Sequence, residues 1–330
     1  MLSRTANALT WMARYLERAE AAARLADVNL ALSLDMDRDW DQGRAWDAVV
    51  ATTGDLDAFR ERYPQSSRDS ALRFLVLDQE NPNSVANCVR EARENARTVR
   101  ERLPGEAWEL INSVYLRLGP AATHGGGAQV EELLEAVKAT ASQLEGLLSA
   151  SLLRDEGWHF VQLGRFLERA DQTTRLVDVQ HALLERGDSA DPGHELRWEA
   201  VLKSASGLTM YRRRHGVTDG RQVARFLLLD AGFPRSAAYC LNAAEKALRG
   251  LSGTPDGQFV NAAEKALGKL AAQLRYTELE DVLDEGIHLW LDRVQAQLIE
   301  VGGRINAVYF EPGAGPAPTP TFEQPQQQQQ

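Results

Sequence analysis

Apolar residues recur at intervals of three and four along most of this chain, which is the spacing of one face of an α-helix. One such series consists of Leu9, Met12, Leu16, Ala19, Ala23, Ala26 and Leu30. Another consists of Val85, Val89, Ala92, Ala96, Val99 and Leu103. The alternating pattern of a half-buried strand is missing, since the apolar runs FLVL (74–77) and FLLL (226–229) stand in helical context. We therefore predict an all-α protein.

Proline and glycine clusters divide this pattern into segments. Breaks are expected at ENPN (80–83), RLPGE (102–106), GPAATHGGG (119–127), AGFPR (231–235) and SGTPDG (252–257). A long terminal helix is expected at about Glu278–Phe310. Residues 313–330 are rich in Pro, Gly, Ala and Gln, and we expect a disordered tail there.

Much of the chain occurs twice. RYLERAEAAARLADV (14–28) returns as RFLERADQTTRLVDV (165–179), with nine of the fifteen positions identical. WDAVVAT (46–52) returns as WEAVLKS (198–204), and FLVLDQENPNSVANC (74–88) returns as FLLLDAGFPRSAAYC (226–240). The offset stays at 151–152 residues. This predicts two tandem homologous helical repeats, 1–150 and 151–312, packed into one compact unit.

Composition narrows the class of protein. The 330 residues are 44% hydrophobic and carry a formal charge of −10, which is typical of a globular chain. No apolar run approaches the eighteen or so residues of a membrane span, and the N-terminus lacks a signal-peptide core, so a cytoplasmic protein is expected. The acidic balance disfavours nucleic acid as a partner.

The repeated charged helix permits two interpretations. In the structural one, the two copies cross and each arginine forks onto a carboxylate of the other copy. Within the first copy, helix spacing also allows the pairs Arg14–Glu17, Glu17–Arg24 and Glu20–Arg24. In the functional one, the glutamates perform acid–base or metal chemistry and the arginines clamp an anionic substrate. The catalytic candidates are Glu17 and Glu168, and the binding candidates are Arg14, Arg18, Arg24, Arg165, Arg169 and Arg175.

The second halves of the repeats differ. Repeat one keeps an arginine-rich segment, ARENARTVRERLPGEAWELINSVY (92–115), that repeat two lacks. Its candidate binding residues are Glu94, Asn95, Arg97 and Arg100. The alternative is a solvated or salt-bridged helix face.

Metal and cofactor motifs are weak. Glu-x-x-His, a di-metal motif of helical bundles, occurs at 156–159 and 285–288, but each copy has Gly at its second position. Both copies also fit helix starts with Asp155 and Asp284 as N-caps. No phosphate-binding glycine loop or Gly-x-Ser-x-Gly is present. We predict no metal and no cofactor.

Two further pairs recur between the repeats. Asp78 and Asp230 are each followed six residues later by Ser, which indicates a helix-to-helix corner or, as the alternative, a substrate-binding corner. Cys88 and Cys240 occupy apolar positions without a matching histidine. We expect them to be buried small residues and not nucleophiles.

The motifs MLSRTANALTWMARYLERAEAAARLADVN (1–29), FLVLDQENPNSV (74–85) and DEGWHFVQLGRFLERAD (155–171) resemble those of the bacterial alpha-E domain family. The likeness runs from Met1 to about Phe310. It implies a wholly helical protein that is typically encoded beside, or fused to, a circularly permuted ATP-grasp ligase, often near a transglutaminase-like cysteine peptidase.

The function that this resemblance implies is an accessory or binding subunit of an ATP-grasp-type carboxylate–amine ligase, acting on a peptide or peptide-like metabolite. One alternative is an enzyme of the same pathway that forms or hydrolyses amide bonds with Glu17, Glu168 and the arginines. A second alternative is a homo-oligomeric helical scaffold. The sequence names neither the substrate nor the partner.

Overall fold

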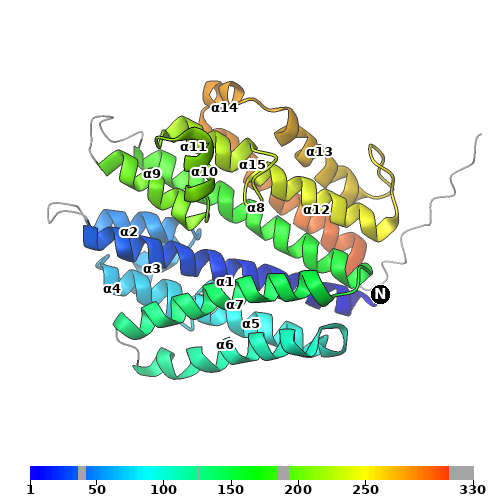
Figure 1. The fold of residues 1–330 in the computed structure, drawn as a ribbon, viewed down its shortest axis with the longest axis horizontal. Coiled ribbons are helices and arrows are strands. Elements are labelled where there is room, and N and C mark those ends of the chain that lie inside the picture. Colours follow the sequence, from blue (N-terminus) through cyan, green and yellow to red (C-terminus); the bar gives the residue numbers. More distant parts are fainter. Residues whose placement is uncertain (36–41, 125–126, 185–192, 312–330) are drawn as a thin grey trace, which may run out of the picture.

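The computed structural model describes residues 1–35, 42–124, 127–184 and 193–311, which form fifteen α-helices and no strand (Figure 1). The prediction of an all-α fold is confirmed for these residues. The expected tail, 313–330, lies outside them. None of the described helices is long and apolar enough to cross a membrane.

Four long helices build the first half of the chain. They are α1 (Ser3–Asp35), α5 (Val85–Thr98), α6 (Gly105–His124) and α7 (Gly127–Ser151). Shorter elements connect α1 to α5 and α5 to α6: α2 (Gln42–Ala51), α3 (Leu56–Arg62), α4 (Arg68–Leu72), the π-helical turn η1 (Arg73–Leu77) and the 3₁₀ turn η2 (Arg100–Arg102). Their apolar faces enclose two clusters of buried side chains.

The second half has four long helices of its own. They are α8 (Glu156–Leu184), α12 (Ala237–Ser252), α13 (Ala262–Tyr276) and α15 (Ile287–Ile305). The shorter elements are α9 (Gly193–Ser204), α10 (Leu208–His215), α11 (Gly220–Leu229), α14 (Leu279–Glu285) and η3 (Asn306–Phe310). Most of the largest buried cluster belongs to this half.

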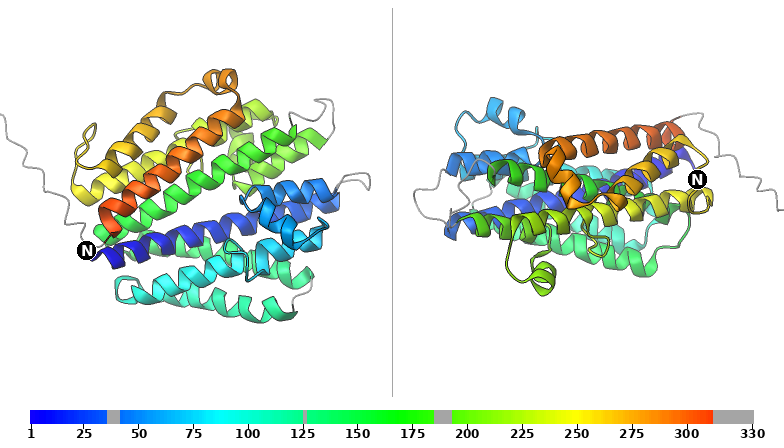
Figure 2. Two further views of the ribbon diagram at one scale, coloured as in Figure 1. Left: turned by 180° about the vertical axis from the view of Figure 1, so that it is seen from behind. Right: turned by 90° about the horizontal axis from the view of Figure 1, so that it is seen from above.

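Helices α1 and α8 lie side by side in the middle of the molecule and run in the same direction (Figures 1 and 2). The amino group of Met1 contacts Glu156 at 2.7 Å where both helices begin. A β-carbon at Gly164 would lie 2.3 Å from the carbonyl oxygen of Thr10. Only glycine therefore allows the two backbones to approach so closely at this point.

The repeated Asp-and-Ser corners stand before α5 and α12, and the prediction of a helix-to-helix corner is confirmed. The hydroxyls of Ser84 and Ser236 accept hydrogen bonds from the backbone N–H groups of Asn87 and Tyr239, and so cap the two helices. The carboxylate of Asp230 accepts hydrogen bonds from the backbone N–H groups of Gly232 and Phe233.

Three local expectations need correction. The break expected at 119–127 is wrong for its first half, because α6 continues to His124. The single terminal helix at 278–310 is interrupted at Gly286, whose φ of +94° ends α14 before α15 begins. Asp284 lies inside α14 and is no N-cap, whereas Asp155 does accept a hydrogen bond from the N–H of Gly157 at the start of α8.

Candidate functional site

Two Glu-Arg dipeptides face each other across α1 and α8. Arg169 forks onto Glu17, with Nε 2.6 Å from Oε1 and Nη2 2.9 Å from Oε2. Arg18 forks onto Glu168, with Nε 2.6 Å from Oε1 and Nη2 3.2 Å from Oε2. We call these four residues the Glu–Arg lock. The pairing that the structural interpretation expected between the two copies is present.

Glu168 is the most enclosed member of the lock, with no exposed side-chain surface. Its carboxylate accepts further hydrogen bonds from Arg14 at 2.8 Å and from Gln172 at 3.1 Å. Burial alone would raise the pKa of Glu168, but the charges of Arg14 and Arg18 outweigh it and lower the pKa to about 2. The residue is therefore a fixed anion at neutral pH.

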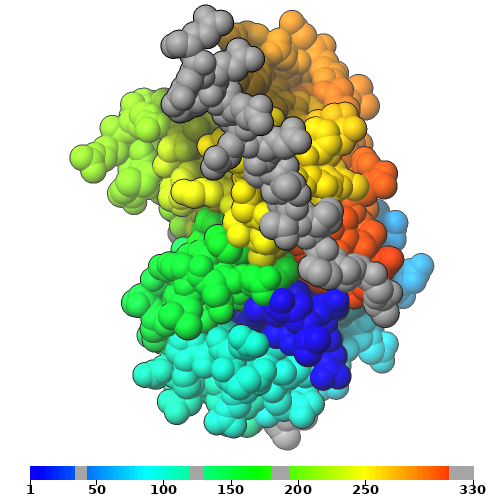
Figure 3. All heavy atoms as spheres, turned by 90° about the vertical axis from the view of Figure 1, so that its right-hand side faces the viewer, coloured from blue at the N-terminus to red at the C-terminus, as the bar shows by residue number. Residues whose placement is uncertain are grey.

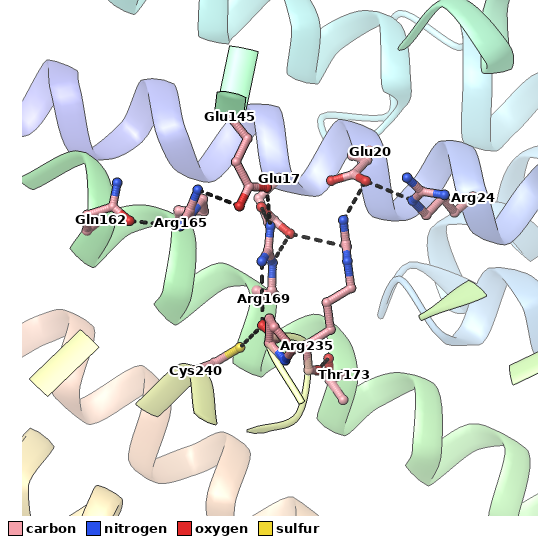
Figure 4. A network of polar contacts seen from close by, with 11 residues as sticks. Glu17, Glu20, Arg24, Glu145, Gln162, Arg165, Arg169, Thr173, Arg235 and Cys240 are labelled. Atoms are coloured by element: carbon pink, nitrogen blue, oxygen red, sulfur yellow. Dashed lines mark hydrogen bonds and ion pairs between the residues drawn. The ribbon is translucent and has the colours of Figure 1, made fainter. Parts of the chain in front are cut away.

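The Glu17–Arg169 pair of the lock belongs to a longer network of ion pairs (Figure 4). Arg169 also reaches Glu145 of α7 at 3.3 Å. Arg235, from the corner before α12, lies 2.6 Å from Glu20 and 3.6 Å from Glu17. Burial alone would lower the pKa of Arg169, but its ion pair with Glu17 outweighs this and raises the pKa.

Every arginine proposed as a binding residue in these two helices holds a carboxylate. Outside the lock, Arg24 pairs with Glu20 at 2.8 Å, as expected from their spacing. The pairs not yet described are Arg165–Glu145 at 2.9 Å and Arg175–Asp171 at 2.9 Å. Two other expected pairs are wrong. Arg14 pairs with Glu168 because α8 brings that carboxylate closer, and Glu17 pairs with Arg169 of α8 instead of Arg24.

Three small cavities adjoin the lock. Two of about 40 Å³ are lined by Glu17 among others, and one of them also by Arg169 and Arg235. The third measures about 120 Å³ and is lined by Arg18, Ala22, Thr53, Asn83, Asp171, Gln172 and Arg175. We call it the Arg175 cavity. Sequence reasoning missed Asn83, Thr53 and Gln172, although the replacement of Asn83 by Arg235 in the second copy was a visible signal.

The arginine-rich surface of α5 and α6 is internally paired. Arg93 lies over the rings of Trp108 and Tyr115, at 5.4 and 4.6 Å from their centroids. Glu94 pairs with Arg93 and with Arg97, at 2.6 and 2.8 Å. The remaining candidates are placed nearby: Asn95 donates to the carbonyl of Glu91, and Arg100 lies over Trp108. Arg97 remains well exposed on this surface.

The weak metal motifs do not come together as a di-metal set in the described residues. His159 packs against Gly250. His288 lies between Asp178, at 2.7 Å from Nδ1, and Asp292, at 3.6 Å from Nε2. These three could offer ligand atoms within 4.8 Å of one another, but hydrogen bonding between the imidazole and the carboxylates accounts for the same contacts.

The two cysteines are buried, as expected. Burial raises the pKa of both Cys88 and Cys240 to about 12, so each thiol is protonated at neutral pH. Each thiol points to a proline carbonyl of its own corner, Pro82 and Pro234 respectively. Neither is suited to act as a nucleophile.

These features define a helical protein whose two central helices are joined by reciprocal glutamate–arginine pairs. The chain belongs to the Alpha-E family, described as a predicted alpha-helical domain with a conserved ER motif, whose model matches residues 1–310. It is similar to the uncharacterized protein Rv2567 of Mycobacterium tuberculosis and to the uncharacterized protein Mb2597 of Mycobacterium bovis. Each is 26% identical over 319 residues, covering 87% of this chain and 34% of the relative. The chain thus spans about a third of the length of these relatives. No solved structure matches it.

Proposed function

We propose that this chain is an accessory or binding subunit of an ATP-grasp-type carboxylate–amine ligase that forms or modifies a peptide or peptide-like metabolite. The observation that carries this proposal is that Glu17 and Glu168, the best catalytic candidates, are both held in ion pairs across α1 and α8. A general acid or base works best with a pKa near the operating pH, whereas the pKa of Glu168 is about 2. This disfavours the alternative of an enzyme acting through these residues.

The length of the relatives supports a role beside other protein parts, because this chain matches only about a third of each. The scaffold alternative has less support. The apolar stripe of α15 is buried against its own half, and its exposed apolar residues Leu289 and Ile299 stand ten positions apart.

We also propose that residues 1–150 and 151–312 are homologous repeats, and that the family's ER motif corresponds to Glu17–Arg18 and Glu168–Arg169. The reciprocal pairing supports both ideas. In each dipeptide the glutamate pairs with the arginine of the other dipeptide, and the arginine pairs with the other glutamate.

The decisive experiment is co-purification with an ATP-grasp ligase of the kind typically encoded beside members of this family, followed by an assay of ADP release with candidate amino acids and peptides. We expect a stable complex and ADP release that depends on this chain. Addition of the neighbouring transglutaminase-like peptidase tests the second expected partner.

A matched pair of variants tests whether the α5 surface takes part. Arg97→Ala removes an exposed arginine that pairs with Glu94. Arg304→Ala removes a similarly exposed arginine, paired with Glu300, on α15. We expect only the first to weaken the complex. Absence of a complex, together with ligase activity that is indifferent to this chain, would sink the proposal.

A further inference from the structure

The Arg175 cavity has a sequence counterpart in the cavity lined by Arg235, and the two linings differ at several positions, among them Asn83 against Arg235. Asn83 and Arg235 occupy the same place in NPNS (81–84) and FPRS (233–236). Arg235 extends its guanidinium to Glu20 and Glu17, and the cavity that it lines measures about 40 Å³. Asn83 is shorter, and the cavity that it lines measures about 120 Å³. Arg235 therefore fills the space beside the Glu17–Arg169 pair, whereas the space beside the Arg18–Glu168 pair, next to Asn83, stays open.

The open side presents an unused fork of hydrogen-bond donors. Arg175 gives its Nε to Asp171 at 2.9 Å, and this is its one polar partner among the described residues. Gly54, with a φ of +82°, packs closely against the guanidinium, since a β-carbon there would lie 3.0 Å from Nη1. The two terminal nitrogens of Arg175 can therefore bind a carboxylate in bidentate fashion. Arg18 adds a second positive charge to the same cavity.

The same cavity also presents acceptors. Gln172 donates its Nε2 to Glu168, which leaves its carbonyl oxygen for another donor. Thr53 donates its hydroxyl to the carbonyl of Val50 and can still accept. Asp171 contributes a carboxylate to the lining. These groups suit an ammonium, whereas a phosphate dianion would be repelled by Asp171.

The size fits a small solute. The cavity of about 120 Å³ is well above the roughly 10–15 Å³ that a single water needs, so it has room for a small solute. A small α-amino acid carries its carboxylate and ammonium on one carbon. Arg175 and Asp171, joined by a hydrogen bond of 2.9 Å, likewise hold a positive and a negative group next to each other.

We propose that the Arg175 cavity binds a free α-amino acid with a small side chain. The carboxylate lies on Arg175, with Arg18 behind it, and the ammonium lies between Asp171 and Gln172. The inference deepens the proposed function and rests on it only for the role of this amino acid as the ligase's substrate. Binding itself is a property of the isolated chain.

The test is isothermal titration of the isolated chain with L-alanine, acetate and inorganic phosphate, accompanied by amide NMR shifts. We expect L-alanine to bind and to shift the amides of Gly54 and Gln172. Acetate and phosphate should each bind at least about tenfold more weakly, because each lacks the ammonium.

Variants locate the site. Asn83→Arg should fill the cavity as Arg235 fills its counterpart. Arg175→Gln removes the guanidinium donors. Each variant should weaken alanine binding at least about tenfold. Arg24→Gln is the matched control. Arg24 is the sequence counterpart of Arg175 and pairs with Glu20 in the same way, but it does not line this cavity. It should change binding less than about twofold.

Four results would overturn the inference. They are no alanine binding at concentrations on the order of 10 mM, equal binding of phosphate, unchanged binding by Asn83→Arg, and equal losses in Arg175→Gln and Arg24→Gln. If Asn83→Arg does not fold, the comparison of the other two variants decides. Because no partner is present, failure here leaves the complex with the ligase untouched. Failure of the complex likewise leaves alanine binding intact.

Discussion

Replacing Glu168 by Gln should be among the most costly single changes in this protein. The carboxylate has no exposed surface and neutralises Arg14 and Arg18. An amide keeps the shape but has one acceptor oxygen, and its NH₂ group faces the guanidinium donors. The variant therefore leaves two partly buried arginines without a counter-charge.

The size of the loss follows from the pKa of Glu168. Folding lowers it from the ordinary 4.5 to about 2, and each pH unit corresponds to about 1.4 kcal/mol, so the ionised carboxylate contributes about 3 kcal/mol. This agrees with the 3–5 kcal/mol or so that breaking a buried ion pair usually costs. The free energy of unfolding, measured by urea denaturation at pH 7, should fall by about that amount.

The pH dependence has a definite sign. Between about pH 4.5 and pH 2 the unfolded chain binds the proton of Glu168 and the folded chain does not, so this stabilisation is complete above pH 4.5 and is lost as the pH falls. The difference between wild type and Glu168→Gln should shrink accordingly. Glu300→Gln, at an exposed pair with Arg304, is the control and should cost less than about 0.5 kcal/mol. A loss below about 1 kcal/mol for Glu168→Gln would refute the reasoning.

Three other outcomes follow from the packing. Gly164→Ala should lower the free energy of unfolding by about 1–3 kcal/mol, because its β-carbon would lie 2.3 Å from an α1 carbonyl oxygen. Gly146→Ala, in open space on α7, should raise it by about 0.5–1 kcal/mol. Thermal unfolding that ranks the two variants the other way contradicts the close approach of α1 and α8. Ser236→Ala removes the N-cap of α12 and should cost about 1 kcal/mol in the same assay, and an unchanged midpoint would show that the cap is dispensable. Cys88 and Cys240 should resist a thiol reagent at pH 8 until the protein unfolds, and rapid labelling of the native chain would contradict their burial.

The sequence was sufficient for the helices, which depend on spacing within one segment, and for the general form of the lock, which follows from the likeness of residues 14–28 and 165–179. The partner of each arginine was harder to predict. Arg14 could reach Glu17 by helix spacing, but its partner is Glu168, and that choice depends on how α8 crosses α1. Two expectations conflicted near Gly286, a single helix over 278–310 and a helix start after Asp284, because the apolar period continues on both sides of the break. A helix end made by one backbone angle leaves little trace in periodicity.

The Arg175 cavity was harder still to predict, because it lies where Asn83 is shorter than its sequence counterpart Arg235. Its lining comes from α1, α8 and the segments that follow α2 and precede α5, and no local pattern joins them. The one trace in the sequence is a difference between the copies, Asn83 against Arg235. Comparing the two similar segments position by position reveals this difference, which a motif search does not.

The ion pairs between α1 and α8 fix the register of the two helices, which leucines at the same positions would not do. Buried ion pairs add little stability compared with well-packed apolar residues, but they tolerate few arrangements. A seam of leucines could slide by one turn and still pack, whereas sliding the lock by one turn would separate Glu17 from Arg169 and Arg18 from Glu168 and leave buried charges unpaired. The lock therefore fixes the register of the two helices. Since Arg18 stands on one helix and Arg175 on the other, the same register sets the shape of the cavity between them. The four side chains of the lock can thus shape this cavity without performing chemistry.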